Sequence, residues 1–283
     1  MKKIRYKAFD KDFKCRGFLY EVGKEYEIQG EMIPCQNGFH ACENPLDIFN
    51  YYDMIESRFA QVEQGGDIKE DRDKTCSSRI KIKAELKLAD IIRLGVEWII
   101  DKTKINGSSG DSAKIGSSGN YAQIGSSGDY AQIGSSGDSA QIGSSGYSAQ
   151  IGSSGDSAQI GSSGDYAKIG SSGDYAKIGS SGYSAQIGSS GYSAQIGSSG
   201  DSAQIGSSGY SAQIESTGKD SVICCAGCDS KVKAKKGSWI TLSEWKSNKP
   251  ICVKTEYVDG ERIKEDTWYE LKDGEFQICQ EQK

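Results

Sequence analysis

The stretch that decides the fold is Gly134-Ser135-Ser136-Gly137-Asp138-Ser139-Ala140-Gln141-Ile142, one copy of a nine-residue unit that recurs through the middle of the chain. Ala and Ile alternate with a polar residue, which is the two-residue period of a short strand with one buried face. The Gly-Ser-Ser-Gly segment supplies the small, conformationally permissive residues that a corner needs, and it would interrupt a helix. Each unit therefore predicts a short strand and a corner.

The repeat continues without interruption over more than a hundred residues. Nine residues are too few to enclose a core, so we expect two units, 18 residues, in each coil, with two strands facing each other. Twelve units then make about six coils, and a strand spacing of about 4.8 Å gives a rod roughly 29 Å long. Ile105 belongs to the series with one extra residue of spacing. The regular positions are Ile115, Ile124, Ile133, Ile142, Ile151, Ile160, Ile169, Ile178, Ile187, Ile196, Ile205, Ile214 and Ile223.

A flexible Gly/Ser linker is the alternative for a stretch of this composition. A linker has no use for an Ile at every ninth position, whereas stacked coils bury continuous Ile and Ala ladders. We therefore expect a mainly β protein. Its solenoid of two nonapeptides per coil should span residues 105–232, between an N-terminal α+β capping module (1–104) and a small C-terminal β cap (233–283).

The flanks of the repeat carry signals for capping elements, which stacked coils need at their open ends. Residues 86–102 place apolar side chains at near-helical spacing and predict a helix that covers the first coil. Val232 falls where the next Ile is expected, and the rhythm fades after it. Asp259-Gly260 and Asp273-Gly274, each between short apolar runs, predict two β-hairpins.

Composition and charge exclude several classes of protein. The formal charge of -5 and the pI of about 5.2 argue against the positive field needed for direct nucleic-acid binding. No secretory signal and no apolar run of membrane-spanning length is present, so we expect no membrane association. The nine cysteines are odd in number and unevenly spaced, which favours reduced thiols in a cytosolic setting.

The outward positions of the repeat form the candidate binding surface. Gln or Lys precedes every Ile of the twelve units, so stacking would align these side chains into ladders that hydrogen-bond along the stack. A Tyr occurs in eight of the twelve units, and a surface of Tyr, Ser and Gly is typical of protein recognition. The alternative is that the tyrosines stack on one another and stiffen the rod. The candidate partner-binding residues are Tyr121, Tyr130, Tyr147, Tyr166, Tyr175, Tyr183, Tyr192 and Tyr210.

The repeat fits poorly with calcium binding, with ice binding and with mimicry of a nucleic acid. Asp is absent from five of the twelve units and has no second carboxylate nearby, unlike calcium-binding nonapeptides. Flat ice-binding solenoids resemble this one but use Thr ladders, and only Thr217 lies at the margin of the repeat. Seven Asp against three Lys over residues 107–214 are too few for a nucleic-acid mimic. Cys224, Cys225 and Cys228 offer at best one zinc-ligand pair, so we expect buried thiols and neither metal nor cofactor.

The two ends of the chain resemble one uncharacterised family that is common in bacteriophage genomes. The N-terminal motifs are Phe9-Asp10-Lys11-Asp12, Cys15-Arg16-Gly17-Phe18, the run from Tyr20 to Tyr26, and Gly38-Phe39-His40 through Asp47. The C-terminal motifs are Val258-Asp259-Gly260, Asp266-Thr267-Trp268-Tyr269 and Leu271-Lys272-Asp273-Gly274. The resemblance implies a phage or prophage origin and carries no established activity.

An enzymatic alternative rests on the N-terminal module. Arg16-Gly17, Gly38 through Tyr51, and Gln61-Val62-Glu63 resemble the arginine, the strand-helix and the Gln-x-Glu turn of ADP-ribosyltransferases, with Glu63 as the catalytic carboxylate. The module is short for that fold and lacks its Ser-Thr-Ser strand. His40, the one histidine, beside Phe39, is typical of a packed residue rather than a base.

We therefore expect a non-enzymatic binding protein in the host cell cytoplasm. Its solenoid would present a rigid face to a host protein or ribonucleoprotein and inhibit a defence factor. A virion-associated structural or host-recognition protein is the first alternative and the ADP-ribosyltransferase-like enzyme the second. The sequence leaves the oligomeric state open, including a homo-oligomer.

Overall fold

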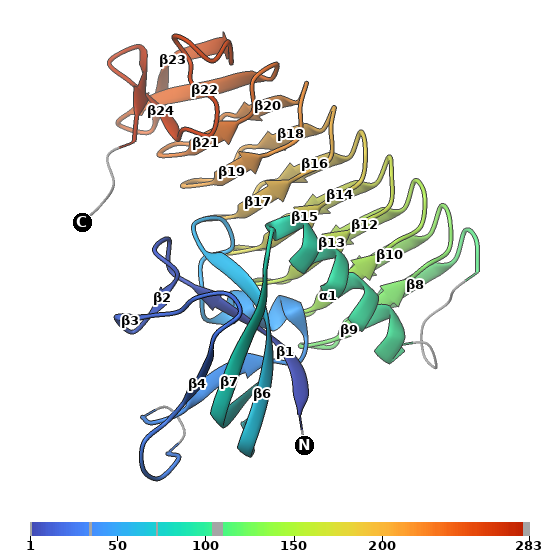
Figure 1. The fold of residues 1–283 in the computed structure, drawn as a ribbon. Coiled ribbons are helices and arrows are strands. Elements are labelled where there is room, and N and C mark those ends of the chain that lie inside the picture. The colour runs from blue at the N-terminus through green and yellow to red at the C-terminus, as the bar shows by residue number, and fades with distance from the viewer. Residues whose placement is uncertain (1, 34–35, 72, 104–109, 280–283) are drawn as a thin grey trace. The chain divides into compact units, whose positions relative to one another are not determined.

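The computed structural model describes residues 2–33, 36–71, 73–103 and 110–279, and it divides into two compact units, Met1–Trp98 and Ile99–Lys283 (Figure 1). Ile105, Cys35 and the expected first residues of the solenoid lie outside the described residues. The chain is mainly β, as expected.

The N-terminal unit is built on an antiparallel sheet with strand order β4-β7-β5-β1-β6, in which β6 and β7 also pair with each other. Four of the five strands therefore close into a small barrel, whose interior holds Phe9, Val62, Ile80 and Ile82. A two-stranded ribbon, β2 and β3, stands beside it. The strands are β1 (Lys3–Phe9), β2 (Lys14–Cys15), β3 (Phe18–Leu19), β4 (Glu25–Glu27), β5 (Phe39–Cys42), β6 (Arg58–Asp71) and β7 (Lys74–Leu86).

Two helical segments complete this part of the chain. The 3₁₀ helix η1 (Pro45–Asn50) begins where Asn44 accepts a hydrogen bond from the Leu46 amide, and proline occupies its first position. Helix α1 (Leu88–Thr103) confirms the helix expected over residues 86–102. Gly95 lets α1 approach η1, because a Cβ there would lie 2.5 Å from Cγ of Leu46.

The C-terminal unit contains the solenoid, and two nonapeptides form each coil as expected (Figure 1). Its strands alternate between two parallel sheets, here called the β8 sheet and the β9 sheet after their first strands. Fourteen strands, β8 to β21, make about seven coils. They are β8 (Lys114–Ser117), β9 (Gln123–Ser126), β10 (Gln132–Ser135), β11 (Gln141–Ser144), β12 (Gln150–Ser153), β13 (Gln159–Ser162), β14 (Lys168–Ser171), β15 (Lys177–Ser180), β16 (Gln186–Ser189), β17 (Gln195–Ser198), β18 (Gln204–Ser207), β19 (Gln213–Ser216), β20 (Val222–Cys225) and β21 (Lys231–Ala234).

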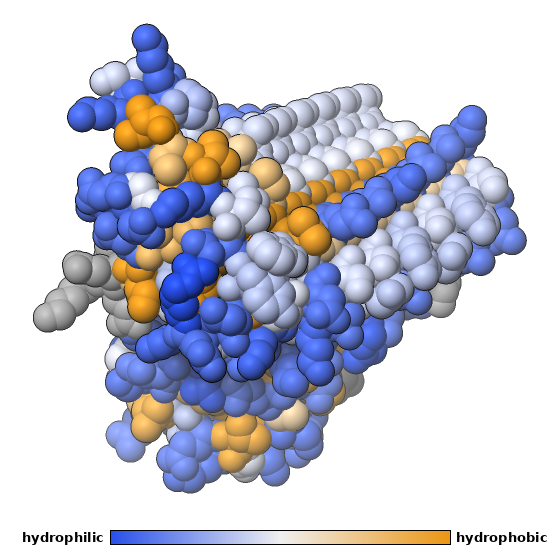
Figure 2. All heavy atoms as spheres, turned by 90° about the horizontal axis from the view of Figure 1, so that it is seen from above, coloured by the Kyte–Doolittle hydropathy of each residue, from blue (hydrophilic) through white to orange (hydrophobic). Residues whose placement is uncertain are grey.

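Equivalent residues of successive coils lie directly over one another. Ile133 pairs with Ile151 of the next coil, and Gln132 with Gln150. Ala, Ile and the first Ser of each unit point inward, and the buried Ile and Ala side chains form the continuous ladders that the spacing predicted. Residues of like hydropathy consequently run in straight rows along the solenoid (Figure 2).

The corners differ from the expectation in one respect. Neither glycine of the repeat supplies the left-handed backbone; the sixth residue, Ser or Tyr in the regular units, does so, with φ between +51° and +59°. The second glycine instead permits close stacking. A Cβ on Gly173 would lie 2.5 Å from the carbonyl carbon of Gly155 in the preceding coil, and closer still to its oxygen.

The solenoid continues past its expected end at Val232. Strand β22 (Trp239–Lys246) lies parallel to β20, with Trp239 aligned to Val222 and Leu242 to Cys225. Strand β23 (Lys249–Tyr257) then turns back along β22 and forms the edge of the β8 sheet. The turn is made by Ser247 and Asn248, both left-handed, a hairpin signal that the sequence analysis missed.

The other sheet is closed by the hairpin of β24 (Tyr269–Lys272) and β25 (Glu275–Ile278), which confirms the prediction at Asp273-Gly274. The hairpin predicted at Asp259-Gly260 is wrong. The carboxylate of Asp259 accepts hydrogen bonds from the amides of Glu261 and Ile263, so these residues form a local loop instead of pairing strands.

Two glycine substitutions test whether the close stacking of the coils requires the second glycine of the unit. We expect Gly173→Ala to destabilise the solenoid by about 1–3 kcal/mol or more, because the added methyl group collides with backbone that cannot yield. Gly170→Ala is the matched control: its Cβ would meet nothing within 4 Å, and replacing a strand glycine should be neutral or stabilising by up to about 1 kcal/mol. The measurement is the urea midpoint of the β-sheet circular-dichroism signal; equal midpoints for the two variants would contradict the stacking argument.

Candidate functional site

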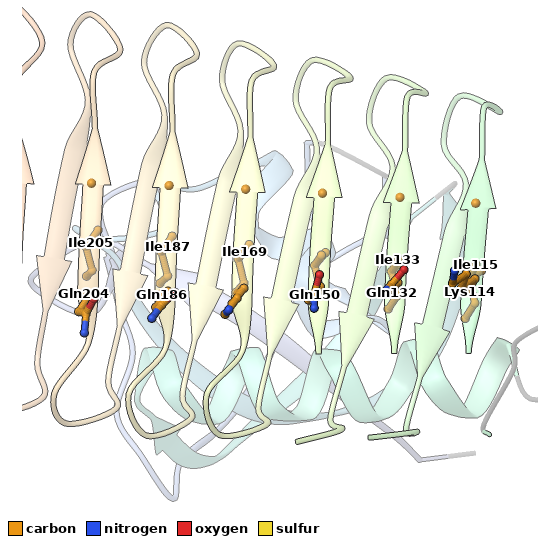
Figure 3. A pocket seen from close by; sticks show the side chains of 18 of the residues that line it. Lys114, Ile115, Gln132, Ile133, Gln150, Ile169, Gln186, Ile187, Gln204 and Ile205 are labelled. Carbon is orange, nitrogen blue, oxygen red and sulfur yellow. The ribbon is translucent and has the colours of Figure 1, made fainter. Parts of the chain in front are cut away.

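The outer surface of the β8 sheet carries a row of polar side chains, one from each strand. All six are exposed, and within the described chain their side chains make no hydrogen bond or ion pair. Figure 3 shows five of them in one line across successive strands. Four of the six side chains end in amides and two in ammonium groups, so hydrogen-bonding groups recur about every 4.8 Å along this surface. This amide row consists of Lys114, Gln132, Gln150, Lys168, Gln186 and Gln204.

A row of glycines runs beside the amide row. A Cβ added at any of these glycines would meet nothing within 4 Å, so the fold of this sheet does not require them. A strand glycine costs stability and often marks a place where another backbone or a ligand approaches closely. The two rows line a shallow groove of about 1170 Å³. We call the amide row and the glycine row together the open face; the glycines are Gly116, Gly134, Gly152, Gly170, Gly188 and Gly206.

The β9 sheet shows what such a glycine can accommodate. Gly125 holds the same position in its repeat unit, and the last turn of α1 lies against it. A Cβ on Gly125 would lie 2.9 Å from Cα of Ile100 and would also collide with the hydroxyl of Thr103. A glycine at this position thus lets a helix backbone lie directly on the strand.

The open face ends in an apolar and aromatic patch. Val222, Trp239 and Tyr257 continue the line of the amide row on β20, β22 and β23, and they are 53%, 49% and 40% exposed. The Trp239 and Tyr257 rings lie 5.1 Å apart. The sequence analysis missed this patch, because it expected the repeat to end before Trp239.

The eight predicted tyrosines do not share one surface. Because successive corners lie on opposite sides of the coil, the tyrosines divide between the two edges of the solenoid, away from the open face. One edge holds a column of Tyr130, Tyr147, Tyr166 and Tyr183, with ring centroids 5.2 to 5.9 Å apart. The other edge holds Tyr175, Tyr192 and Tyr210, 5.3 to 5.5 Å apart, and Tyr121, which is 77% exposed. Seven of the eight rings therefore contact another Tyr ring, edge-on or tilted in four pairs and stacked in the pair Tyr192–Tyr210, and their partner-binding role stays a prediction.

The corner aspartates have a structural function. The carboxylate of Asp174 accepts a hydrogen bond from the backbone amide of Tyr192 in the next coil at 2.7 Å, and Asp129 does the same for Tyr147. Asn120 replaces Asp at one corner and accepts from the amide of Asp138. In the described residues no group of three or more His, Cys, Asp or Glu side chains is arranged to hold a metal ion.

The cysteines at the end of the repeat, where its sequence becomes irregular, occupy defined positions of the nine-residue unit. Cys225 takes the place of an inward Ser and is buried, whereas Cys224 takes a glycine position on the β8 sheet and is exposed. Cys228 stands at a corner and is half-buried. All eight described cysteines carry free thiols; Cys35 lies outside the described residues.

The N-terminal module has a pocket of its own, of about 440 Å³. Arg16, His40 and Tyr51, three residues of the ADP-ribosyltransferase resemblance, all line it. Glu63 does not: its carboxylate pairs with Lys2 at 2.8 Å. Gln61-Val62-Glu63 lies in the middle of β6 instead of a turn, and Arg16 lies in the turn between β2 and β3 instead of a strand. The structure thus brings together part of the expected set and separates its catalytic carboxylate from it.

Positive charge gathers in this pocket. Lys7, on β1, is 5% exposed, and its ammonium lies 3.5 Å from the thiol of Cys15, which in turn lies 3.0 Å from the hydroxyl of Tyr52. Burial lowers the pKa of Lys7. Burial, and then the charges of Lys74, Lys7 and Arg16, lower the pKa of His40. The pocket is therefore a cationic site whose histidine is kept neutral.

Comparison with known protein families finds a match in the N-terminal region. Residues 3–94 match the model of a family described as a domain of unknown function, DUF7666. No curated protein and no solved structure matches the chain. Among the described helices, none combines the length and apolar character needed to cross a bilayer.

The corner aspartates can be tested by two substitutions at one position. Asp174→Ala should destabilise the solenoid by about 0.5–1.5 kcal/mol, because the amide of Tyr192 loses its acceptor. Asp174→Asn should be neutral, since Asn120 already fulfils this function. The urea midpoints of the two variants measure the change in stability. Equal losses of stability would show that the corner requires the carboxylate charge and not only a hydrogen-bond acceptor.

The buried lysine allows a stability prediction with a defined pH dependence. Because its pKa is lowered in the folded state, the unfolded chain binds more protons between the folded pKa and the ordinary value of 10.5, and stability rises with pH there. Lys7→Met should therefore stabilise the module by about 1–2 kcal/mol at pH 7, a gain that vanishes above pH 10.5.

The module's own unfolding is followed by pulse-labelling the buried thiols of Cys42 and Cys76 at increasing urea concentrations. The exposed Lys69→Met is the control, and we expect no change from it. A Lys7→Met variant that unfolds at lower urea than the unchanged chain at pH 7 would contradict the prediction.

Proposed function

We propose that the chain is a non-enzymatic, phage-encoded binding protein that acts in the host cytoplasm. Its open face docks a host protein, and this partner belongs to a bacterial defence system that the binding inhibits. The observation that carries the proposal is the exposed amide row beside glycines that its own sheet does not need. The phage origin and the defence partner are supported by the resemblance of both chain ends to a phage family.

The open face favours a helical segment of a protein as its occupant. The last turn of α1 already lies on the equivalent glycine, Gly125, so the geometry accepts a helix backbone. Unengaged glutamine amides can hydrogen-bond to polar side chains of such a helix. The groove has Lys114 and Lys168 and, among its described lining residues, no carboxylate, which favours a neutral or acidic helix.

The patch at the end of the face would contribute most of the apolar contact. Trp and Tyr are enriched among the residues that dominate binding energy in protein interfaces. Trp239 and Tyr257 are already in contact with each other, so little conformational freedom is lost when a partner covers them. Two lysines on the open face are too few for nucleic-acid binding driven by phosphate contacts.

The test is capture of partners from host lysate, with and without nuclease, by the tagged full chain and two variants. Gly188→Glu adds bulk and negative charge to the glycine row, where a Cβ meets nothing within 4 Å, so the fold should persist. Tyr147→Ser interrupts one tyrosine column at a corner. We expect a nuclease-resistant protein partner that Gly188→Glu loses by at least tenfold and Tyr147→Ser retains.

The opposite pattern, loss with Tyr147→Ser and retention with Gly188→Glu, would move the binding site to the tyrosine columns. Absence of any partner would overturn the proposal. Detection in purified virions would then favour the structural alternative, and NAD turnover that Glu63→Gln abolishes would favour the enzyme.

A further inference from the structure

The pocket of the N-terminal module combines a buried cation with aromatic walls, and the proposed function of the solenoid does not use it. Its basic lining residues are Lys7, Arg16, Lys74 and the neutral His40, and no carboxylate is among the described residues that line it. Its volume of about 440 Å³ suits a small molecule rather than a macromolecular segment. We propose that this pocket binds a small anionic ligand with a planar ring, of the nucleotide class.

Two buried cations on β1 differ in their partners. Arg5 is 9% exposed and has its own carboxylate, because its guanidinium lies 3.0 Å from Glu43. Lys7, two residues along, is 5% exposed, and its polar contact is a thiol, that of Cys15. A buried ammonium without a counter-charge is costly, and such a group in a cleft marks a candidate functional site. An anion in the pocket would supply the missing charge.

The rings around Lys7 attract its positive charge but do not neutralise it. The ammonium lies 5.2 Å from the ring centroid of Phe9 and 5.9 Å from those of Tyr20 and Tyr52. Each cation–π contact of this kind contributes less than the burial of a charge costs. These contacts fix the position of the ammonium, but they do not supply a negatively charged partner.

The pocket also offers a place for a planar ring. Phe18, on β3, lines the pocket and is 50% exposed, and its ring is held edge-on against Tyr20 at 4.9 Å. Tyr51 lines another side, with the ammonium of Lys74 4.6 Å from its ring centroid and its hydroxyl bonded to Asp73. A base that stacks on an exposed, pre-positioned aromatic ring is stabilised by that contact. The cationic side chains of the pocket suit the phosphate of a nucleotide, and its aromatic side chains suit the base.

Asp71 and Asp73 lie next to the pocket without lining it. Asp73 accepts hydrogen bonds from Asn50 and Tyr51, and Asp71 lies 4.0 Å from Lys74, at the limit of an ion pair. The two carboxylates therefore already contact Asn50, Tyr51 and Lys74. Lys7 remains the buried cation that an anion bound in the pocket would contact.

The test measures binding of ribonucleoside 5′-monophosphates and diphosphates to the full chain by calorimetry, with inorganic phosphate and adenosine as partial probes. We expect at least one nucleotide to bind ten times more tightly than either partial probe. Lys7→Met should weaken that nucleotide at least tenfold while the thiols of Cys42 and Cys76 stay as protected as in the unchanged chain. Phe18→Ala, at an exposed site, should bring nucleotide affinity down toward that of phosphate.

The control is Lys69→Met, which removes an exposed lysine of the same module and should change affinity by less than twofold. Absence of binding by every nucleotide at millimolar concentration would overturn the proposal, as would affinity unchanged by Lys7→Met in a folded variant. Phosphate binding as tightly as any nucleotide would overturn the assignment of a planar ring. Loss of the solenoid's partner in the capture experiment leaves these outcomes unaffected, because no solenoid residue lines the pocket.

Discussion

Close contact between the backbones of successive coils is the constraint on which the solenoid depends. From Gly128 onward, the second glycine of each unit lies against the same glycine one coil earlier, where no Cβ fits. Strand hydrogen bonds, the Ile and Ala ladders and the side-chain bonds between corners all require this spacing. The same constraint explains which positions of the unit vary. Corner residues five and six project away from the stack and change between Asp, Asn, Tyr and Ser, whereas Ala, Ile and the stacking glycine stay fixed.

The glycine of the open face stands outside this explanation. Within the twelve regular units it is as constant as the stacking glycine, yet a side chain at this position of the β8 sheet would point into open space. A position that is fixed without an internal reason points to an external contact. The two candidate sites therefore differ in kind: the open face is long, flat and polar and suits a macromolecule, whereas the N-terminal pocket is small, cationic and aromatic. One chain could present both, because they are built in different units.

Much of the fold follows from local spacing in the sequence. The nine-residue interval predicted two facing strands per coil, the apolar spacing predicted α1, and Asp273-Gly274 predicted a hairpin; all three are confirmed. Whether a corner lies on one edge or the other depends on whether its unit is odd or even, so the division of the tyrosines was implicit in the same spacing. The pocket was not accessible in this way. Lys7, His40 and Lys74 come from separate strands that meet because β5 pairs with both β1 and β7, and Arg16 comes from the turn after β2. No sequence pattern announces these pairings.

Alternation between the two sheets also limits how the gene can change. A residue is stacked on the residue 18 positions away, whereas the equivalent residue of the next unit lies in the opposite sheet. Gain or loss of a single nonapeptide by recombination between the near-identical coding repeats would move every downstream strand to the other sheet. Trp239 and Tyr257 would leave the line of the open face, and the two closing hairpins would exchange sides. Heritable length variants that preserve the surface should therefore differ by whole coils, in steps of two units.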